Sequence, residues 1–207
     1  MKNAKKALIL VLCAALLVGA SVMGTLAYLQ MQTQTVTNTF TVGNVKITMD
    51  EAKVDEYGDE VDGTRIDVTN AALSHTYKLI PGREYVKDPV IRVTADSEAC
   101  WLFVKVENGI VDYEAGTTGT TITEQLIANG WTALTGFSGV YYIYVDADTA
   151  EAGEDYNVFE SFTIKNTLTN DQLAAIPAKT KILVTAYAIQ ADGFGDAATA
   201  WRNGNFS

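Results

Sequence analysis

The chain has 207 residues and carries 25 acidic against 15 basic side chains, which gives a net charge of −10 at pH 7. This excess of negative charge excludes nucleic acid and anionic lipid as expected partners, because both would repel the protein. Two cysteines cannot build a disulfide framework, so a hydrophobic core must hold the fold together.

The first 27 residues predict a secretory signal peptide. Three lysines lie among the first six residues, a long apolar run follows, and the run ends in small residues. We expect cleavage between Ala27 and Tyr28. A retained membrane anchor is the alternative, because about 20 apolar residues can span a bilayer. Gly19, Ser21 and Gly24 interrupt the run and favour cleavage.

Cleavage would leave a mature chain of one-domain size. Residues 1–27 contain three of the 15 basic residues and none of the 25 acidic ones, so the mature net charge would be −13. Such a charge suits a soluble exported protein. Cys100 would be the one remaining cysteine, and its apolar neighbours in EACWLFVKV predict a small buried side chain rather than a reactive thiol.

The stretch AYLQMQTQTVTNTFTVGNV, from Ala27 to Val45, contains no charged residue and has threonine at every second position from 33 to 41. This alternation predicts an extended strand. The beginning of the stretch offers little apolar surface, whereas Phe40 and Val42 share one face. We therefore expect an extended N-terminal segment over residues 28–40, followed by a single domain over residues 41–207.

The next segment changes phase and then becomes acidic. Gly43 and Asn44 predict a bulge or tight turn, after which Val45, Ile47 and Met49 share a face. Residues 51–65, EAKVDEYGDEVDGTR, predict a solvated loop or a hairpin extension. Their carboxylates could bind Ca²⁺, which takes oxygen ligands, but their spacing matches no calcium-loop signature. We expect no cofactor, with calcium at this segment as the open alternative.

Turn and strand signals dominate residues 78–106. Pro81 followed by Gly82 predicts a type II turn, in which proline fixes φ and glycine accepts a positive φ. Pro89 cannot donate a ladder hydrogen bond and therefore marks a strand start or a sheet edge. The nearly continuous apolar run of residues 100–106 predicts a central strand that is buried on both faces.

The second half of the chain alternates strands with short helices. Residues 121–134 predict a helix that is capped by Thr121 or Thr123 and ends at Asn129-Gly130. Further predicted elements are strands over 139–148 and 181–194, an alternating stretch over 157–168, a short helix over 171–176 and a terminal helical turn. Many strands and few helices predict an all-β fold, a jelly-roll-like β-sandwich with a few short helices in the connections.

Residues for catalysis are scarce. His75 is the only histidine, so neither an H-E-x-x-H helix nor a second imidazole is available for zinc. Acidic pairs such as Asp146/Asp148 and Glu154/Asp155 could serve a glycosidase, but 25 acidic residues produce such pairs by chance. His75 is expected at the surface or at the rim of a strand.

An aromatic group is the remaining candidate for ligand binding. Alternation places Tyr142 and Tyr144 on one face of a predicted strand, where they could stack on a carbohydrate. Packing within the protein is the favoured role of such rings.

Several stretches together carry a family resemblance. They are the signal end GTLAYL, then VTNTFTVGNVKITMDE, KLIPGREYVKDPVIRV, EACWLFVKVEN and TAYAIQADGF. With these stretches the chain resembles the TasA/camelysin family over nearly its whole length, with residues 51–65 and 107–160 the least distinctive. The resemblance implies an exported protein of Gram-positive bacteria, processed by a signal peptidase of the SipW type. It further implies a jelly-roll domain at the cell surface or in the extracellular matrix, where members polymerise into biofilm fibres.

The same resemblance implies how such fibres form: the N-terminal segment of one subunit completes the sheet of the next. Edge strands offer unpaired N–H and C=O groups that an extended segment can satisfy. A head-to-tail contact that does not close gives filaments. We therefore expect a homopolymer, with other matrix proteins as further candidate partners. The candidate donor strand comprises Tyr28, Leu29, Met31, Thr33, Thr35 and Val36.

Two alternatives remain. Some relatives carry a metallopeptidase label, which implies a camelysin-like surface metallopeptidase, although His75 alone cannot build an ordinary zinc site. We therefore expect no catalytic, cofactor-binding or metal-ligating residues. The other alternative is a monomeric surface adhesin or carbohydrate binder.

Overall fold

The computed structural model describes residues 5–6, 10–16, 45–69, 75–116, 121–145, 154–177 and 180–206. The chain divides into two units, Met1–Thr41 and Val42–Ser207. In the first unit, residues 10–16 are helical and exposed. No helix among the described residues combines the length and the hydropathy that a membrane span needs.

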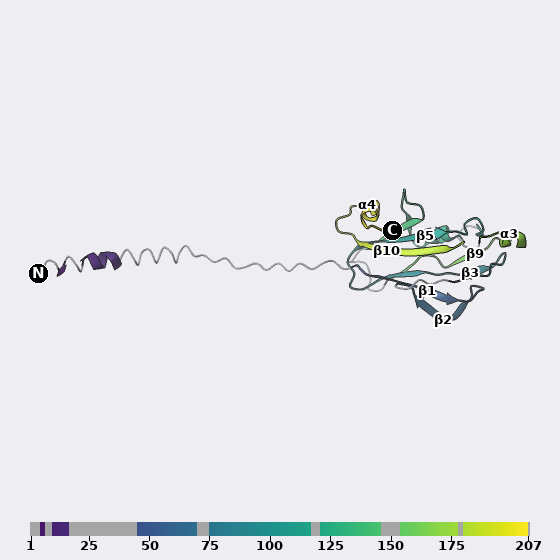
Figure 1. The fold of residues 1–207 in the computed structure, drawn as a ribbon, viewed down its shortest axis with the longest axis horizontal. Helices are drawn as coiled ribbons and strands as arrows, with labels where there is room; N and C mark the ends of the chain where they lie inside the picture. The colour runs from purple at the N-terminus through teal and green to yellow at the C-terminus, as the bar shows by residue number, and fades with distance from the viewer. Residues whose placement is uncertain are drawn as a thin grey trace. The chain divides into compact units, whose positions relative to one another are not determined.

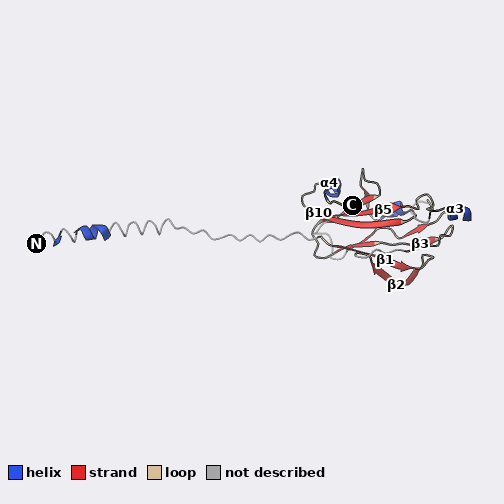
Figure 2. Cartoon of the chain, in the orientation of Figure 1, coloured by secondary structure: helices blue, strands red, loops and turns tan. Residues whose placement is uncertain are grey.

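The second unit is built mainly from antiparallel strands (Figures 1 and 2). One sheet has the order β2-β1-β4-β8, formed by β1 (Ile47–Val54), β2 (Glu60–Asp67), β4 (Val90–Val93) and β8 (Asp155–Asn157). The other has the order β10-β5-β7-β6, formed by β5 (Cys100–Asn108), β6 (Thr132–Ala133), β7 (Val140–Val145) and β10 (Ile182–Gln190).

A two-stranded sheet and short helices complete the unit. Strand β3 (Glu84–Val86) pairs with β9 (Ser161–Thr163). The helices are α2 (Ile122–Ala128), α3 (Asn170–Ala174) and α4 (Ala197–Asn203). The expectation of an all-β fold with a few short helices is therefore confirmed.

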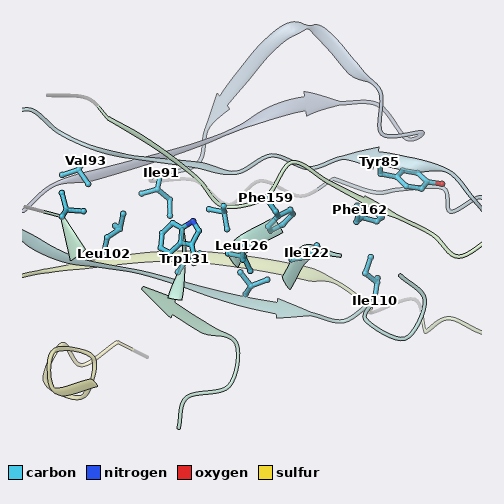
Figure 3. Packing of buried hydrophobic residues seen from close by; sticks show 14 of the residues in the cluster. Tyr85, Ile91, Val93, Leu102, Ile110, Ile122, Leu126, Trp131, Phe159 and Phe162 are labelled. Carbon is cyan, nitrogen blue, oxygen red and sulfur yellow. The ribbon is translucent and has the colours of Figure 1, made fainter. Parts of the chain in front are cut away.

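The main core lies between the two four-stranded sheets. Figure 3 shows Ile91 and Val93 of β4 facing the same interior as Leu102 of β5, with Trp131 among them. Ile91 and Leu102 are fully buried. Burial of apolar surface from both sheets in one cluster stabilises the packing of the two layers against each other.

Strand β5 is the central strand that the sequence predicts. It pairs with β10 on one side and with β7 on the other. Alternation sends Leu102 and Val104 to the main core and Phe103 to a second cluster on the opposite face. That second cluster packs against α4 through Trp201, whose ring lies 5.2 Å from the Phe103 ring.

Cys100, at the start of β5, is fully buried, as its apolar surroundings predict. Burial raises the pKa of the Cys100 thiol to about 11. The thiolate, which is the nucleophilic form, is therefore disfavoured at neutral pH.

Local signals in the sequence define several boundaries. The Arg83 N–H donates to the Ile80 carbonyl at 3.2 Å and Gly82 has φ of 76°, which confirms the type II turn. Thr121 caps α2 in a capping box with Glu124. The helix ends at Ala128, with Asn129 as its C-cap and Gly130 at a φ of 88°, and β6 begins at Thr132.

One sequence expectation needs refinement, and another is settled between its two alternatives. The alternating pattern places Val158 and Phe159 on opposite faces, but both are buried because residues 158–160 leave the strand geometry between β8 and β9. Of the two alternatives for segment 51–65, a solvated loop or a hairpin extension, the structure shows the hairpin: β1 continues to Val54 and β2 returns from Glu60. In the turn between them, the Asp55 carboxylate accepts the Tyr57 and Asp59 N–H groups at 2.8 and 3.0 Å.

Candidate functional site: the edge of strand β10

The outer strands of the two sheets differ in length and charge. Strands β6 and β8 contain two and three residues, too few to offer a long pairing edge. Strand β2 has eight residues, EVDGTRID, and four of them are charged. Strand β10 has nine residues, ILVTAYAIQ, and none is charged. Charged and short edges resist the addition of another strand, so β10 is the edge best suited to accept one.

The inner face of β10 is incompletely covered. Ile182, Val184, Ala186 and Ala188 pack against the main core but are only partly buried. The residues that face the same core from the neighbouring strand β5 are fully or almost fully buried. Within the described residues, β5 is the one strand that pairs with β10. Among the described residues, nothing covers the sandwich along this edge.

The start of β1, in the opposite sheet, is also only partly covered by the described residues. Strand β1 contacts β10 across the core. Val45, Ile47 and Met49 pack against the core on one face, as the sequence predicts, yet all three remain partly exposed. An added strand beside β10 would bury apolar surface on both layers, which favours its addition by about 25 cal/mol for each Å² removed from water.

A groove lies at the beginning of this edge. Its volume is about 710 Å³, and it is lined by residues 75–77, the end of α3 and residues 180–183. Leu79, Phe162 and Ile182 supply apolar walls. The groove therefore combines an apolar interior with the starting point of an uncharged edge strand.

Polar groups line one part of the groove. The Lys87 ammonium donates to both Glu51 oxygens at 2.9 and 3.0 Å, and this pair is almost completely buried. The Tyr77 hydroxyl donates to the Val86 carbonyl at 3.3 Å. Burial raises the pKa of the Tyr77 phenol, and the negative charges of Glu51 and Asp88 raise it further. Tyr77 therefore stays protonated, and the lysine charge is neutralised by its partner.

The outer face of the first sheet carries an ion-pair network that crosses its strands. Arg65 of β2 contacts the carboxylates of Asp50 and Asp88. Arg92 of β4 contacts Asp50 at 3.4 Å and holds Asp155 of β8 through contacts of 2.5 and 2.9 Å. The Arg92 hydrogen bonds lower the pKa of the Asp155 carboxyl. These charges tie β2, β1, β4 and β8 together and leave their carboxylates paired.

Several predicted site residues lie outside the described part of the chain. They are the cleavage residues Ala27 and Tyr28, the candidate donor residues Tyr28, Leu29, Met31, Thr33, Thr35 and Val36, and the acidic pair Asp146 and Asp148.

The other acidic pair is occupied by internal contacts. Asp155 binds Arg92, and Glu154 accepts a hydrogen bond from the Tyr156 hydroxyl at 3.1 Å. Across the described residues, no group of three or more His, Cys, Asp or Glu side chains is arranged to hold a metal ion.

The aromatic residues Tyr142 and Tyr144 do share a face, as alternation predicts. Their rings lie 5.9 and 4.9 Å from the ring of Trp101 on the outer face of the second sheet. Tyr144 is 49% exposed. Both rings are thus at least partly used in packing within the sheet.

His75 is partly buried and lines the groove beside β10, which agrees with the rim position expected for it. The sequence did not single out Glu51 or the β10 edge. Glu51 follows Val45, Ile47 and Met49 in alternation, and this spacing is the signal that could have placed its side chain on the inner face. Nothing in ILVTAYAIQ marks an edge, because an uncharged strand is also typical of the interior of a sheet.

Comparison with known proteins gave no relative: no family model matches the chain, and no curated protein and no solved structure matches it.

Proposed function

We propose that this chain is a secreted structural protein of the cell surface or biofilm matrix, and that it polymerises into fibres by N-terminal strand donation. The observation that carries the proposal is the long, uncharged and half-covered edge of β10. Its counterpart is the uncharged, alternating stretch of residues 28–36. An edge that lacks a strand and a segment suited to become one are the two halves of a head-to-tail contact.

The energetics of such a contact are favourable. A donated strand of about eight residues would form several ladder hydrogen bonds, each contributing about 1 kcal/mol. It would also cover the partly buried side chains Ile182, Val184 and Ala186. We further propose that the two-sheet domain is a jelly-roll-like sandwich, in which the donated strand extends the β10-β5-β7-β6 sheet.

The proposal includes export and processing. A signal peptidase of the SipW type would cleave after Ala27 and free the donor segment outside the cell. The partners would be further copies of the chain, and other matrix proteins. No catalytic step forms part of the proposed function.

Deletion of residues 28–36 tests the donor role. The deleted chain should be secreted as a folded monomer that forms no fibres by negative-stain electron microscopy, because it has an acceptor edge and no donor. Added to the unaltered chain, it should stop fibre growth at substoichiometric amounts, since it can bind a growing end but cannot bind the next subunit. Fibres made by the deleted chain alone would refute strand donation by this segment.

A further inference from the structure

The groove beside β10 contains an imidazole nitrogen with an unmet hydrogen-bonding requirement. His75 Nε2 is buried and has no hydrogen-bond partner within the described part of the chain. A buried polar atom without a partner destabilises the protein, because it has lost its bond to water and gained nothing in return. A ligand in the groove could therefore supply the hydrogen-bond partner that His75 Nε2 lacks in the free domain.

The surroundings of His75 define what such a ligand must be. Thr76 and Thr180 line the same groove, and Leu79, Phe162 and Ile182 form its apolar walls. The ammonium group of Lys87 is already paired with Glu51. Lys181 also lines the groove but is exposed, so it is solvated at the groove's rim. An occupant with apolar and uncharged polar side chains on one face matches the apolar walls.

Residues 28–36 of the chain have this composition. In an extended segment, Leu29, Met31, Thr33 and Thr35 lie on one face, because side chains alternate between faces. Leu29 and Met31 suit the apolar walls. A strand that inserts these two side chains into the groove also directs Thr33 and Thr35, on the same face, toward it. A hydroxyl can donate to an imidazole nitrogen or accept from it, so threonine satisfies either tautomer of His75.

We propose that His75 is the recognition residue of the groove, and that it pairs with the hydroxyl of Thr33 or Thr35 in residues 28–36 of a second copy of the chain. This inference rests on the proposed strand donation and adds its specificity. The groove then selects a strand with a hydroxyl at one fixed position. This requirement also sets the register of the strand, because a shift by one residue would turn the glutamine and valine side chains of the other face toward His75.

A double-mutant cycle on the secreted chain tests the pairing. The variants are His75→Leu, the near-isosteric pair Thr33→Val with Thr35→Val, and their combination. Loss of the hydroxyls should slow fibre elongation about tenfold, because binding then no longer supplies the hydrogen bond that the buried imidazole lacks. With leucine at position 75 the valine strand should elongate as fast as the threonine strand or faster. If the loss of elongation rate in the combined variant equals the product of the losses in the separate variants, the proposal is wrong.

A matched control uses the other face of the same segment. Gln32→Leu with Gln34→Leu changes polar residues that alternation places away from Thr33, so this pair should show no coupling to His75. Thermal unfolding of every variant checks that the domain still folds. Coupling between Gln32 or Gln34 and His75 would show the opposite face in the groove and contradict the assignment.

The outcomes separate this inference from the proposed function. Fibres formed by the chain without residues 28–36 would refute both the strand donation and the role of His75. If that deletion abolishes fibres while the cycle is additive, strand donation stands and the role of His75 fails. If coupling appears in monomer unfolding and not in elongation, the occupant is the chain's own segment, and recognition of a second copy is refuted.

Discussion

Lys87 and Glu51 form an ion pair inside the sandwich, with the lysine ammonium 2.9 Å from the nearer carboxylate oxygen and both side chains about nine-tenths buried. Glu51 comes from β1, in the acidic hairpin, and Lys87 follows β3. The pair joins the first sheet to the wall of the groove. A buried pair is costly to break, because the remaining charge is left without a partner.

Lys87→Met should therefore lower the free energy of unfolding by about 3–5 kcal/mol. The double variant Lys87→Met with Glu51→Leu should recover most of this loss, since two apolar side chains replace the pair without leaving a charge. Chemical denaturation of both variants measures the difference. Equal losses in the single and double variants would show that packing, rather than charge, dominates at this position.

The pairing of Arg92 with Asp155 predicts a dependence of stability on pH. Asp155 has a lowered pKa in the folded protein, so its stabilising contribution is present above the ordinary pKa of aspartate and is lost as pH falls through the lowered value. The side chains are 39% and 50% exposed, so solvent screening limits the contribution. Arg92→Met should cost about 0.5–1 kcal/mol at pH 7 and nearly nothing near pH 2.

Urea denaturation across pH 2–7 measures this profile. Lys53→Met is the matched control, because Lys53 is exposed on β1 and takes part in no ion pair that the described structure contains. It removes the same charge and should give a smaller, flatter difference. A loss for Arg92→Met that stayed constant down to pH 2 would contradict the ion-pair explanation.

Gly58, in the β1–β2 turn, is held against the buried ring of Tyr85. A Cβ atom added at Gly58 would lie 2.9 Å from the Tyr85 Cα, and its φ is 79°. Gly63 has a similar φ of 62° with nothing within 4 Å. Gly63→Ala should cost about 1 kcal/mol for backbone strain alone, and Gly58→Ala about 2 kcal/mol more for the clash. Melting curves of the two variants isolate the steric part.

A single charge should block the proposed acceptor edge of β10. Ala186 faces the half-covered core and Thr185 faces outward on the same strand. Ala186→Lys should abolish fibre formation, because a donated strand would bury the ammonium group. Thr185→Lys carries the same charge on the exposed face and should still polymerise. Electron microscopy decides, with circular dichroism to confirm folding; fibres from Ala186→Lys would place the acceptor edge elsewhere.

The sequence was most informative where one short stretch determines the structure. The capping box of Thr121 and Glu124, the Pro81-Gly82 turn and the central strand from Cys100 all follow from local chemistry. The apolar face of Val45, Ile47 and Met49 follows from alternation. These features depend on neighbours a few residues away, which the sequence shows directly.

Features that depend on distant pairing could not be predicted. Strand β10 is joined to β5 through contacts such as Val184 with Val106, far apart in the chain. Only this pairing reveals that β10 lies at an edge and that His75 lines a groove beside it. Alternation alone puts Glu51 on the face of Met49, but its buried partner Lys87 lies 36 residues further along the chain and is revealed only by the fold.

The four charged side chains of β2 have a consequence for molecules that meet in solution. Three of them are acidic and one is basic, so two β2 edges that approach each other repel. The uncharged β10 edge has no such barrier. The two flanks of the domain are therefore unequal, and this inequality would give a fibre a direction: growth would proceed through one flank, while the other keeps neighbouring fibres from fusing side by side.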